Sequence, residues 1–175
     1  GFNLDLFNFV KKKFLKNLSQ ITDINTGTLK TIRRLSMQIS ARNQISGTVE
    51  LIEHGKINAE IFIKLKSGYT LVSVITNTAA NNLNLEIGDE VVAIFKSSTV
   101  LITTDITLNI SARNKFQGTV DSINQDEINT ELVIDIGNND KIASVITSSS
   151  FERLKIEKGT QVSAIIKASD VIIGK

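Results

Sequence analysis

The sequence predicts a mainly β protein, with two small five-stranded β-barrels in tandem after an α-helical arm. Two observations support this prediction. The stretch Ser-Ala-Arg-Asn occurs at residues 40–43 and again at residues 111–114, and each copy is followed by Gly-Thr at the same distance. A stretch repeated in this way indicates a duplicated unit. Short runs rich in Ile, Val and Thr also alternate with turn residues, which is typical of antiparallel β-structure.

Composition narrows the possible functions. The 175 residues are 41% hydrophobic and 22% charged, which is ordinary for a globular protein. The net charge of +2 provides no general attraction to nucleic acid or to a membrane surface. The sequence has no Cys and one His, which argues against a thiolate metal site, a metal centre or His-based catalysis. No apolar run approaches the roughly 20 residues of a membrane span. We therefore expect a cytoplasmic protein with no membrane partner.

Residues 1–36 are predicted to form a helical arm. Apolar residues at spacings of three, four and seven predict an amphipathic helix over about residues 3–19. A polar linker follows, and Thr28 can cap a second short helix that begins at Leu29. Lysines 11–13 could bind nucleic acid, although a solvated helix face is the commoner reason for such a run. An apolar helix with no core of its own implies a partner subunit or a further domain.

The duplication extends over the rest of the chain. Residues 40–104 and 111–175, aligned at a constant offset of 71, are identical at roughly 26 of 65 positions without a gap. Within each unit the pattern predicts five strands and one short helix, a combination typical of a small barrel of the OB type. In the first unit the strands are expected at about residues 44–52, 58–66, 70–76, 91–95 and 100–102, and the helix at about residues 78–83.

The groups that recur in both copies could bind an anion. They are hydroxyl and cationic side chains, and charge-assisted hydrogen bonds to a dianion contribute roughly 1.5–3 kcal/mol each. Two of these groups are threonines, Thr76 and Thr147. Each ends a strand just before the short helix, where free backbone N–H groups favour an oxyanion. The single histidine, His54, has Gln125 as its counterpart, and no carboxylate pair recurs near a nucleophile, so we do not expect an enzyme. The recurring groups are Ser40 and Ser111, Arg42 and Arg113, Thr76 and Thr147, and Lys96 and Lys167.

These residues resemble a known family. Ser40-Ala41-Arg42-Asn43-Gln44, Gly47-Thr48-Val49, Asn58-Ala59-Glu60, Val74-Ile75-Thr76-Asn77 and Gly88-Asp89-Glu90-Val91 together resemble the Mop (molbindin, TOBE-type) molybdate-binding domain. The resemblance covers both copies and implies a di-Mop protein, with an arm at residues 1–36, a first Mop domain at 37–105 and a second at 106–175. The arm is similar to the segment that joins the DNA-binding and di-Mop domains of ModE-type molybdate-responsive transcription regulators.

The resemblance implies a function and partners. It implies the effector domain of such a regulator, a homodimer that binds tetrahedral molybdate or tungstate at subunit interfaces by hydrogen bonds alone. DNA would be bound only by an N-terminal domain that precedes Gly1. The alternative is a di-Mop protein for molybdate storage or buffering. Nucleic-acid binding by the barrels is disfavoured because the copies share no aromatic position; Phe62, for example, corresponds to Val133.

The resemblance also assigns site residues. It gives one side of the first pocket to Ser40, Arg42, Lys96 and Ser97. The other side, contributed by the second subunit, would be Thr76 and Ala79, where the family often has Ser. The corresponding residues of the second copy are Ser111, Arg113, Thr147, Ser150, Lys167 and Ala168. We expect both repeats to contribute oxyanion sites, with no metal ion bound to the protein.

Overall fold

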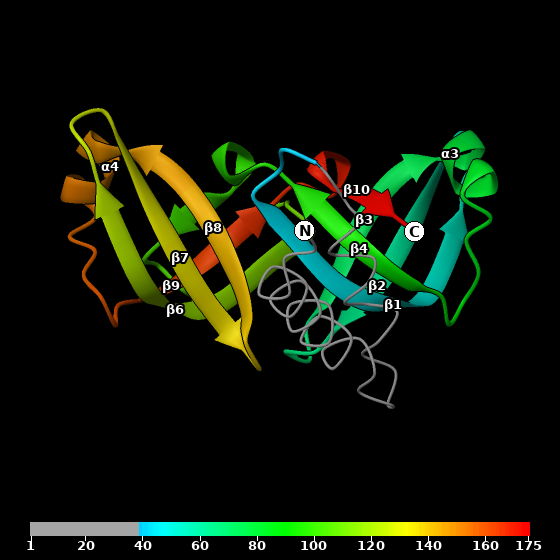
Figure 1. Cartoon of the computed structure of the whole chain (residues 1–175), viewed down its shortest axis with the longest axis horizontal. Helices are drawn as coiled ribbons and strands as arrows, with labels where there is room; N and C mark the ends of the chain where they lie inside the picture. Colours follow the sequence, from blue (N-terminus) through cyan, green and yellow to red (C-terminus); the bar gives the residue numbers. More distant parts are fainter. Residues whose placement is uncertain (1–38) are drawn as a thin grey trace, which may run out of the picture. The chain divides into compact units, whose positions relative to one another are not determined.

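The computed structural model describes residues 39–175 (Figure 1). The helical arm predicted for residues 1–36 lies outside the described residues. The chain divides into two compact units, residues 1–40 and Ala41–Lys175, and the fold described below is that of the second unit. Among residues 39–175, no helix is long and apolar enough to cross a membrane.

Each repeat contains five strands and one short helix, as predicted. The first repeat consists of β1 (Asn43–His54), β2 (Asn58–Leu65), β3 (Thr70–Thr76), α3 (Asn77–Asn82), β4 (Glu90–Phe95), the 3-10 turn η1 (Ser97–Thr99) and β5 (Leu101–Thr103). The second consists of β6 (Asn114–Gln125), β7 (Asn129–Gly137), β8 (Asp140–Thr147), α4 (Ser148–Arg153), β9 (Gln161–Ile166), η2 (Ala168–Asp170) and β10 (Ile172–Gly174). The predicted bounds agree with these to within two residues.

A long strand organises each repeat, and a glycine in it lets the paired strand approach closely. The first half of β1 pairs with β4 and its second half with β2, with a bulge between Val49 and Leu51. A Cβ at Gly47 would lie 2.4 Å from Cγ2 of Ile63, and one at Gly118 would lie 2.5 Å from the carbonyl oxygen of Asp135. The crossing strand therefore approaches too closely for any side chain. This explains why Gly-Thr recurs at the same distance from each Ser-Ala-Arg-Asn stretch.

The two repeats exchange their last strands. The sheets have the orders β10-β4-β1-β2-β3 and β5-β9-β6-β7-β8. Ile172 in β10 pairs with Ile94 of the first repeat, and Leu101 in β5 pairs with Ile165 of the second. Figure 1 shows β10 at the sheet of the first repeat. Residues 100–102 were expected as the fifth strand of the first unit, and the expectation that this strand joins the first unit's own barrel is therefore wrong. The physical reason is that the two free edges carry the same residues, Ala-Ile, at 93–94 and 164–165, so the sequence cannot distinguish them.

Buried side chains fix the exchanged segments. The residues that precede β5 and β10, Val100 and Val171, are 1% and 2% exposed. The hydroxyl of the buried Ser73 donates a hydrogen bond to the carbonyl oxygen of Val171, at 2.7 Å. The hydroxyl of Ser144 donates in the same way to Val100, at 2.8 Å. The exchange is therefore built into the core of both sheets, and a pseudo-twofold relation connects the two repeats.

Candidate functional site

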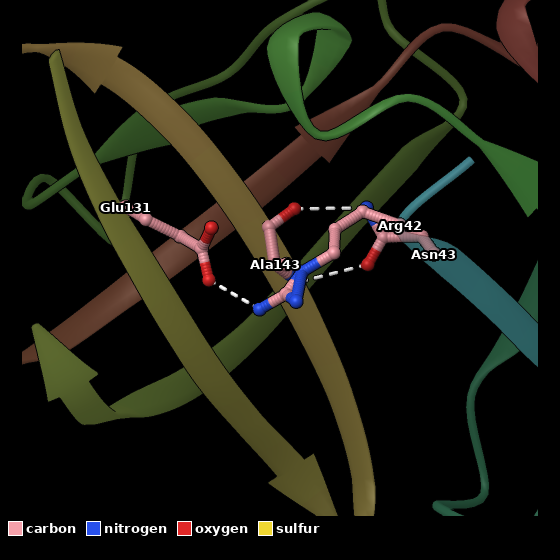
Figure 2. A network of polar contacts seen from close by, with 4 residues as sticks. All are labelled: Arg42, Asn43, Glu131 and Ala143. Carbon is pink, nitrogen blue, oxygen red and sulfur yellow. Dashed lines mark hydrogen bonds and ion pairs between the residues drawn. The ribbon is translucent and has the colours of Figure 1, made fainter. Parts of the chain in front are cut away.

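The asparagine of each Ser-Ala-Arg-Asn stretch joins one repeat to the other. The carboxamide of Asn43, 2% exposed, donates to the carbonyl oxygen of Ala143 and accepts from its N–H, both at 2.8 Å (Figure 2). Asn114, which is fully buried, bonds Val72 in the same way, at 2.8 and 2.7 Å. Val72 and Ala143 lie in β3 and β8, the edge strands of the two sheets. Each carboxamide therefore pairs with an edge strand as a neighbouring strand would.

The arginine of each stretch forms an ion pair with a glutamate of the other repeat. Arg42 contacts Glu131 in β7 (Figure 2), and Nη1 of Arg113 lies 2.7 Å from Oε1 of Glu60 in β2. Both arginine side chains are about half exposed, at 55% and 46%. A guanidinium has five N–H donors in a fork, so one carboxylate leaves others for a further acceptor. The predicted anion-binding arginines are thus already partly neutralised.

A cleft of about 610 Å³ brings together four of the predicted residues: Ser111, Arg113, Lys167 and Ala168. Hydroxyl-bearing residues and one carboxylate complete its polar lining: Ser98, Thr99, Ser169 and Asp170. Lys167 is exposed, and its ammonium has no ion-pair partner within residues 39–175. An ammonium, a guanidinium and several hydroxyls can all donate hydrogen bonds to an oxyanion. The carboxylate of Asp170 would repel the same anion.

The strand exchange explains part of this lining. Ser98 and Thr99 belong to η1 of the first repeat, yet they line the cleft of the second Ser-Ala-Arg-Asn stretch. They were not among the predicted site residues. The sequence could not reveal them because their position depends on β5 entering the other sheet. Ser98 recurs as Ser169, which is the only signal that sequence comparison offered.

The predicted threonines act as helix caps in this structure. The side-chain oxygen of Thr76 accepts from the N–H of Ala79, and that of Thr147 accepts from the N–H of Ser150, each at 3.1 Å. The hydroxyl of Thr147 also donates to Oγ of Ser150 at 2.9 Å. The backbone N–H groups expected to be free for an oxyanion are therefore already bonded at these two positions.

The threonine side and the lysine side of the second copy do not line the same cleft. Ser150 lines a separate groove of about 370 Å³, which shares Leu101, Ile110 and Ile165 with the larger cleft. Within one chain, the two predicted halves of the pocket thus lie on adjoining but distinct surfaces. A second copy of the chain is needed if both halves contact one ligand.

The first copy is described less completely. Lys96 is exposed and Ser97 is partly buried, where β4 ends and η1 begins. Ser40 is exposed and belongs to the unit of residues 1–40, so the structure does not relate it to Arg42 or Lys96. His54, which does not recur in the second copy, is exposed, and its Nδ1 lies 3.1 Å from Oδ1 of Asn77.

The described residues contain no group of three or more His, Cys, Asp or Glu side chains that could hold a metal ion. The resolved pKa shifts concern carboxylates and a lysine that do not line the cleft. A hydrogen bond from Lys141 lowers the pKa of Asp121, and the same contact raises the pKa of Lys141. Hydrogen bonds from Thr107 lower the pKa of Asp105, between the two repeats.

The TOBE domain matches residues 39–102 and 110–173. The molybdenum transport protein ModE of Azotobacter vinelandii is 34% identical over 164 residues, which cover 91% of this chain and 61% of that protein. The transcriptional regulator ModE of Yersinia pestis is 32% identical over 170 residues, which cover 97% of this chain and 65% of that protein. The chain thus spans less than two thirds of the length of these relatives.

A solved structure is also similar. The cytoplasmic molybdate-binding protein ModG, with molybdate bound, matches with a TM-score of 0.76 and 40% identity. The match covers 79% of this chain and 99% of the ModG chain.

Proposed function

This chain belongs to the TOBE domain family, and we propose that it binds molybdate as a tetrahedral oxyanion. The observation that carries the proposal is the cleft where Ser111, Arg113 and Lys167 converge. The ModG relative, at 40% identity, is described as a molybdate-binding protein and supports the choice of anion.

The chemistry of the cleft suits recognition by hydrogen bonds. The ammonium of Lys167, which has no ion-pair partner within residues 39–175, supplies the charge, and charge-assisted N–H···O bonds contribute roughly 1.5–3 kcal/mol each. Arg113 supplies further N–H donors, although Glu60 offsets its charge. In our proposal Thr147 and Ser150 of a second copy close the pocket, so that the binding species is a homodimer. The ligand is held without any bond between the protein and molybdenum.

Calorimetric titration of the purified protein with molybdate, tungstate and sulfate tests the proposal. We expect molybdate and tungstate to bind and sulfate, which is smaller, to bind more weakly. Removing the ammonium with Lys167→Ala should weaken molybdate binding by about 10-fold or more, since a charge-assisted bond of 1.5–3 kcal/mol corresponds to that range.

The matched control is Lys158→Ala, which removes another lysine, one that lines a different surface near Gly159. It should leave the molybdate affinity unchanged. Equal affinities for sulfate and molybdate would contradict the proposal, as would equal effects of the two lysine variants. A stoichiometry of one molybdate per chain, with Arg113→Ala and Lys167→Ala both silent, would contradict a site in the second repeat.

A second candidate concerns the biological role: molybdate sensing by a transcription regulator. It is favoured because the Yersinia pestis ModE regulator matches 97% of this chain, and hence residues that precede Ile39 as well as the two repeats. Storage is favoured by the match to ModG, a molybdate-binding protein of which 99% is covered by 79% of this chain. For sensing, molybdate would have to bind two conformations of the regulator with different affinities, because a ligand shifts a conformational equilibrium only by that difference. DNA binding by the full gene product that changes with molybdate would support sensing, and no DNA binding would support storage.

A further inference from the structure

The first repeat holds the guanidinium of Arg113 from two directions. Oε1 of Glu60 lies 2.7 Å from Nη1, and the ring centroid of Phe62 lies 5.9 Å from Cζ. Glu60 and Phe62 are two residues apart in β2, so their side chains project from the same face of the strand. Carboxylate and ring together restrict both the edge and the face of the planar guanidinium. Arg113 also lines the 610 Å³ cleft, so it is restricted at the wall of the candidate oxyanion site.

The counterpart arginine has only half of this support. Arg42 forms its ion pair with Glu131, the counterpart of Glu60. The counterpart of Phe62 is Val133, however, which has no π-face. The two repeats therefore retain the arginine and the glutamate but differ in the residue that contacts the guanidinium face.

Phe62 is not part of the hydrophobic core. It is partly exposed and lies outside the buried core cluster, which contains its neighbours Ile61 and Ile63. Its ring lies against the guanidinium of Arg113. The exposure of an aromatic ring on the strand face beside an arginine at the cleft points to a role toward that arginine.

We propose that Glu60 and Phe62 are positioning residues for Arg113, and that they make the oxyanion position at the second Ser-Ala-Arg-Asn stretch tighter than the one at the first. The proposal rests on the proposed function, because it ranks two molybdate positions. Its physical basis is preorganisation: a side chain already held in its binding geometry loses less freedom when the ligand arrives. Glu60 contributes orientation and not charge, since it opposes an anion, and Lys167, which forms no ion pair within residues 39–175, supplies the positive charge.

Reciprocal substitutions at the ring position test the affinity order without changing any charge. In calorimetry with molybdate, Phe62→Val should weaken the tighter class of sites by about 2- to 5-fold, the range that an exposed cation–π contact supports. Val133→Phe should tighten the weaker class by a similar factor. Arg113→Lys and Arg42→Lys identify the classes, since each should affect one class only. Phe62→Tyr keeps an aromatic face and should retain the wild-type affinity, whereas Phe62→Leu removes that face and should weaken binding as Phe62→Val does.

An NMR measurement follows the arginine without any ligand. The Nε–Hε resonance of Arg113, identified by its loss in Arg113→Lys, should be displaced by the ring of Phe62. The displacement should disappear in Phe62→Val and return in Phe62→Tyr. A resonance at the unperturbed position in the wild type would overturn the positioning role, whether or not molybdate binds.

The two proposals fail in distinguishable ways. A wild-type protein that binds no molybdate contradicts the proposed function and the affinity order, while a ring-displaced Arg113 resonance still upholds the positioning role. A protein that binds molybdate with unchanged affinities in Phe62→Val upholds the proposed function and overturns the inference. Equal weakening of both classes in Phe62→Val overturns it as well, because the proposed positioning concerns Arg113 and not Arg42.

Discussion

At the scale of single residues, the Ser-Ala-Arg-Asn stretch has two roles. Its asparagine is buried and completes hydrogen bonds of an edge strand of the other repeat. Its arginine lies at the surface, paired with a glutamate of that repeat. One recurring stretch therefore supplies both a structural contact and a wall of the candidate site.

The structural contact can be tested with Asn114→Ala. This substitution leaves the N–H and carbonyl oxygen of Val72 buried without their partner. An unsatisfied buried polar group costs about 1–3 kcal/mol, so we expect a loss of about 2–5 kcal/mol in the free energy of unfolding. Urea denaturation followed by circular dichroism measures it. The exposed Asn124→Ala is the matched control and should change stability little; similar effects of both variants would contradict the assigned role.

The recurring residues could be predicted from the sequence, but the separate roles of the asparagine and the arginine could not. The chemistry of serine, arginine, threonine and lysine groups them as anion ligands. Three of these predicted side chains, Ser111, Arg113 and Lys167, meet in one cleft. The glutamate partners of the arginines could not be deduced, because Glu60 and Arg113 are 53 residues apart and meet only through the packing of one repeat on the other. Asn43 and Asn114 were identified as recurring but were assigned no role.

At the scale of elements, the positions of the strands could be predicted from the sequence, whereas the pairing of the strands could not. Alternating Ile, Val and Thr fixed each strand to within two residues because side-chain periodicity is a local property. The pairing partner of β5 is not local. Two sheet edges of nearly the same sequence were available, and the buried Val100 and Val171 carry the chain across to the other repeat.

Deletion of residues 172–175 tests the exchange. It removes β10, and Lys175 with its 2.9 Å ion pair to Asp89, from the edge of the first repeat's sheet. We expect hydrogen exchange to accelerate most in β4, where Val92 and Ile94 lose their paired strand. Ile172→Thr keeps the backbone pairing at an exposed position and is the control. Faster exchange confined to β9 of the second repeat would show that β10 belongs to its own unit.

At the scale of the whole molecule, the two repeats complete each other. Neither sheet has five strands without a contribution from the other repeat. The asparagine and serine hydrogen bonds between repeats are duplicated in both directions. The repeats should therefore unfold together as one cooperative unit.

A fragment of residues 39–105 tests this dependence. It lacks β10 and carries β5 without the sheet that β5 joins. We expect two copies to exchange β5 and form a dimer whose stability increases with concentration. Size-exclusion chromatography with light scattering, over a range of concentrations, measures the mass. Residues 39–99, which lack β5, provide the control and should not dimerise. A stable monomer of residues 39–105 would contradict the expectation.

Because the repeats exchange strands, the covalent connection between them is not the only thing that holds them together. Residues 104–113 join β5 to β6 through a largely exposed segment, while the pairing of β5 with β9 and of β10 with β4 is independent of that segment. After cleavage of the backbone in this segment, the two polypeptides should stay associated through β5 and β10. Halves that are produced separately should reassemble by fragment complementation. The covalent link acts as a tether that raises the local concentration of one half near the other. In topological terms, the single chain is a dimer whose two members are fused end to end.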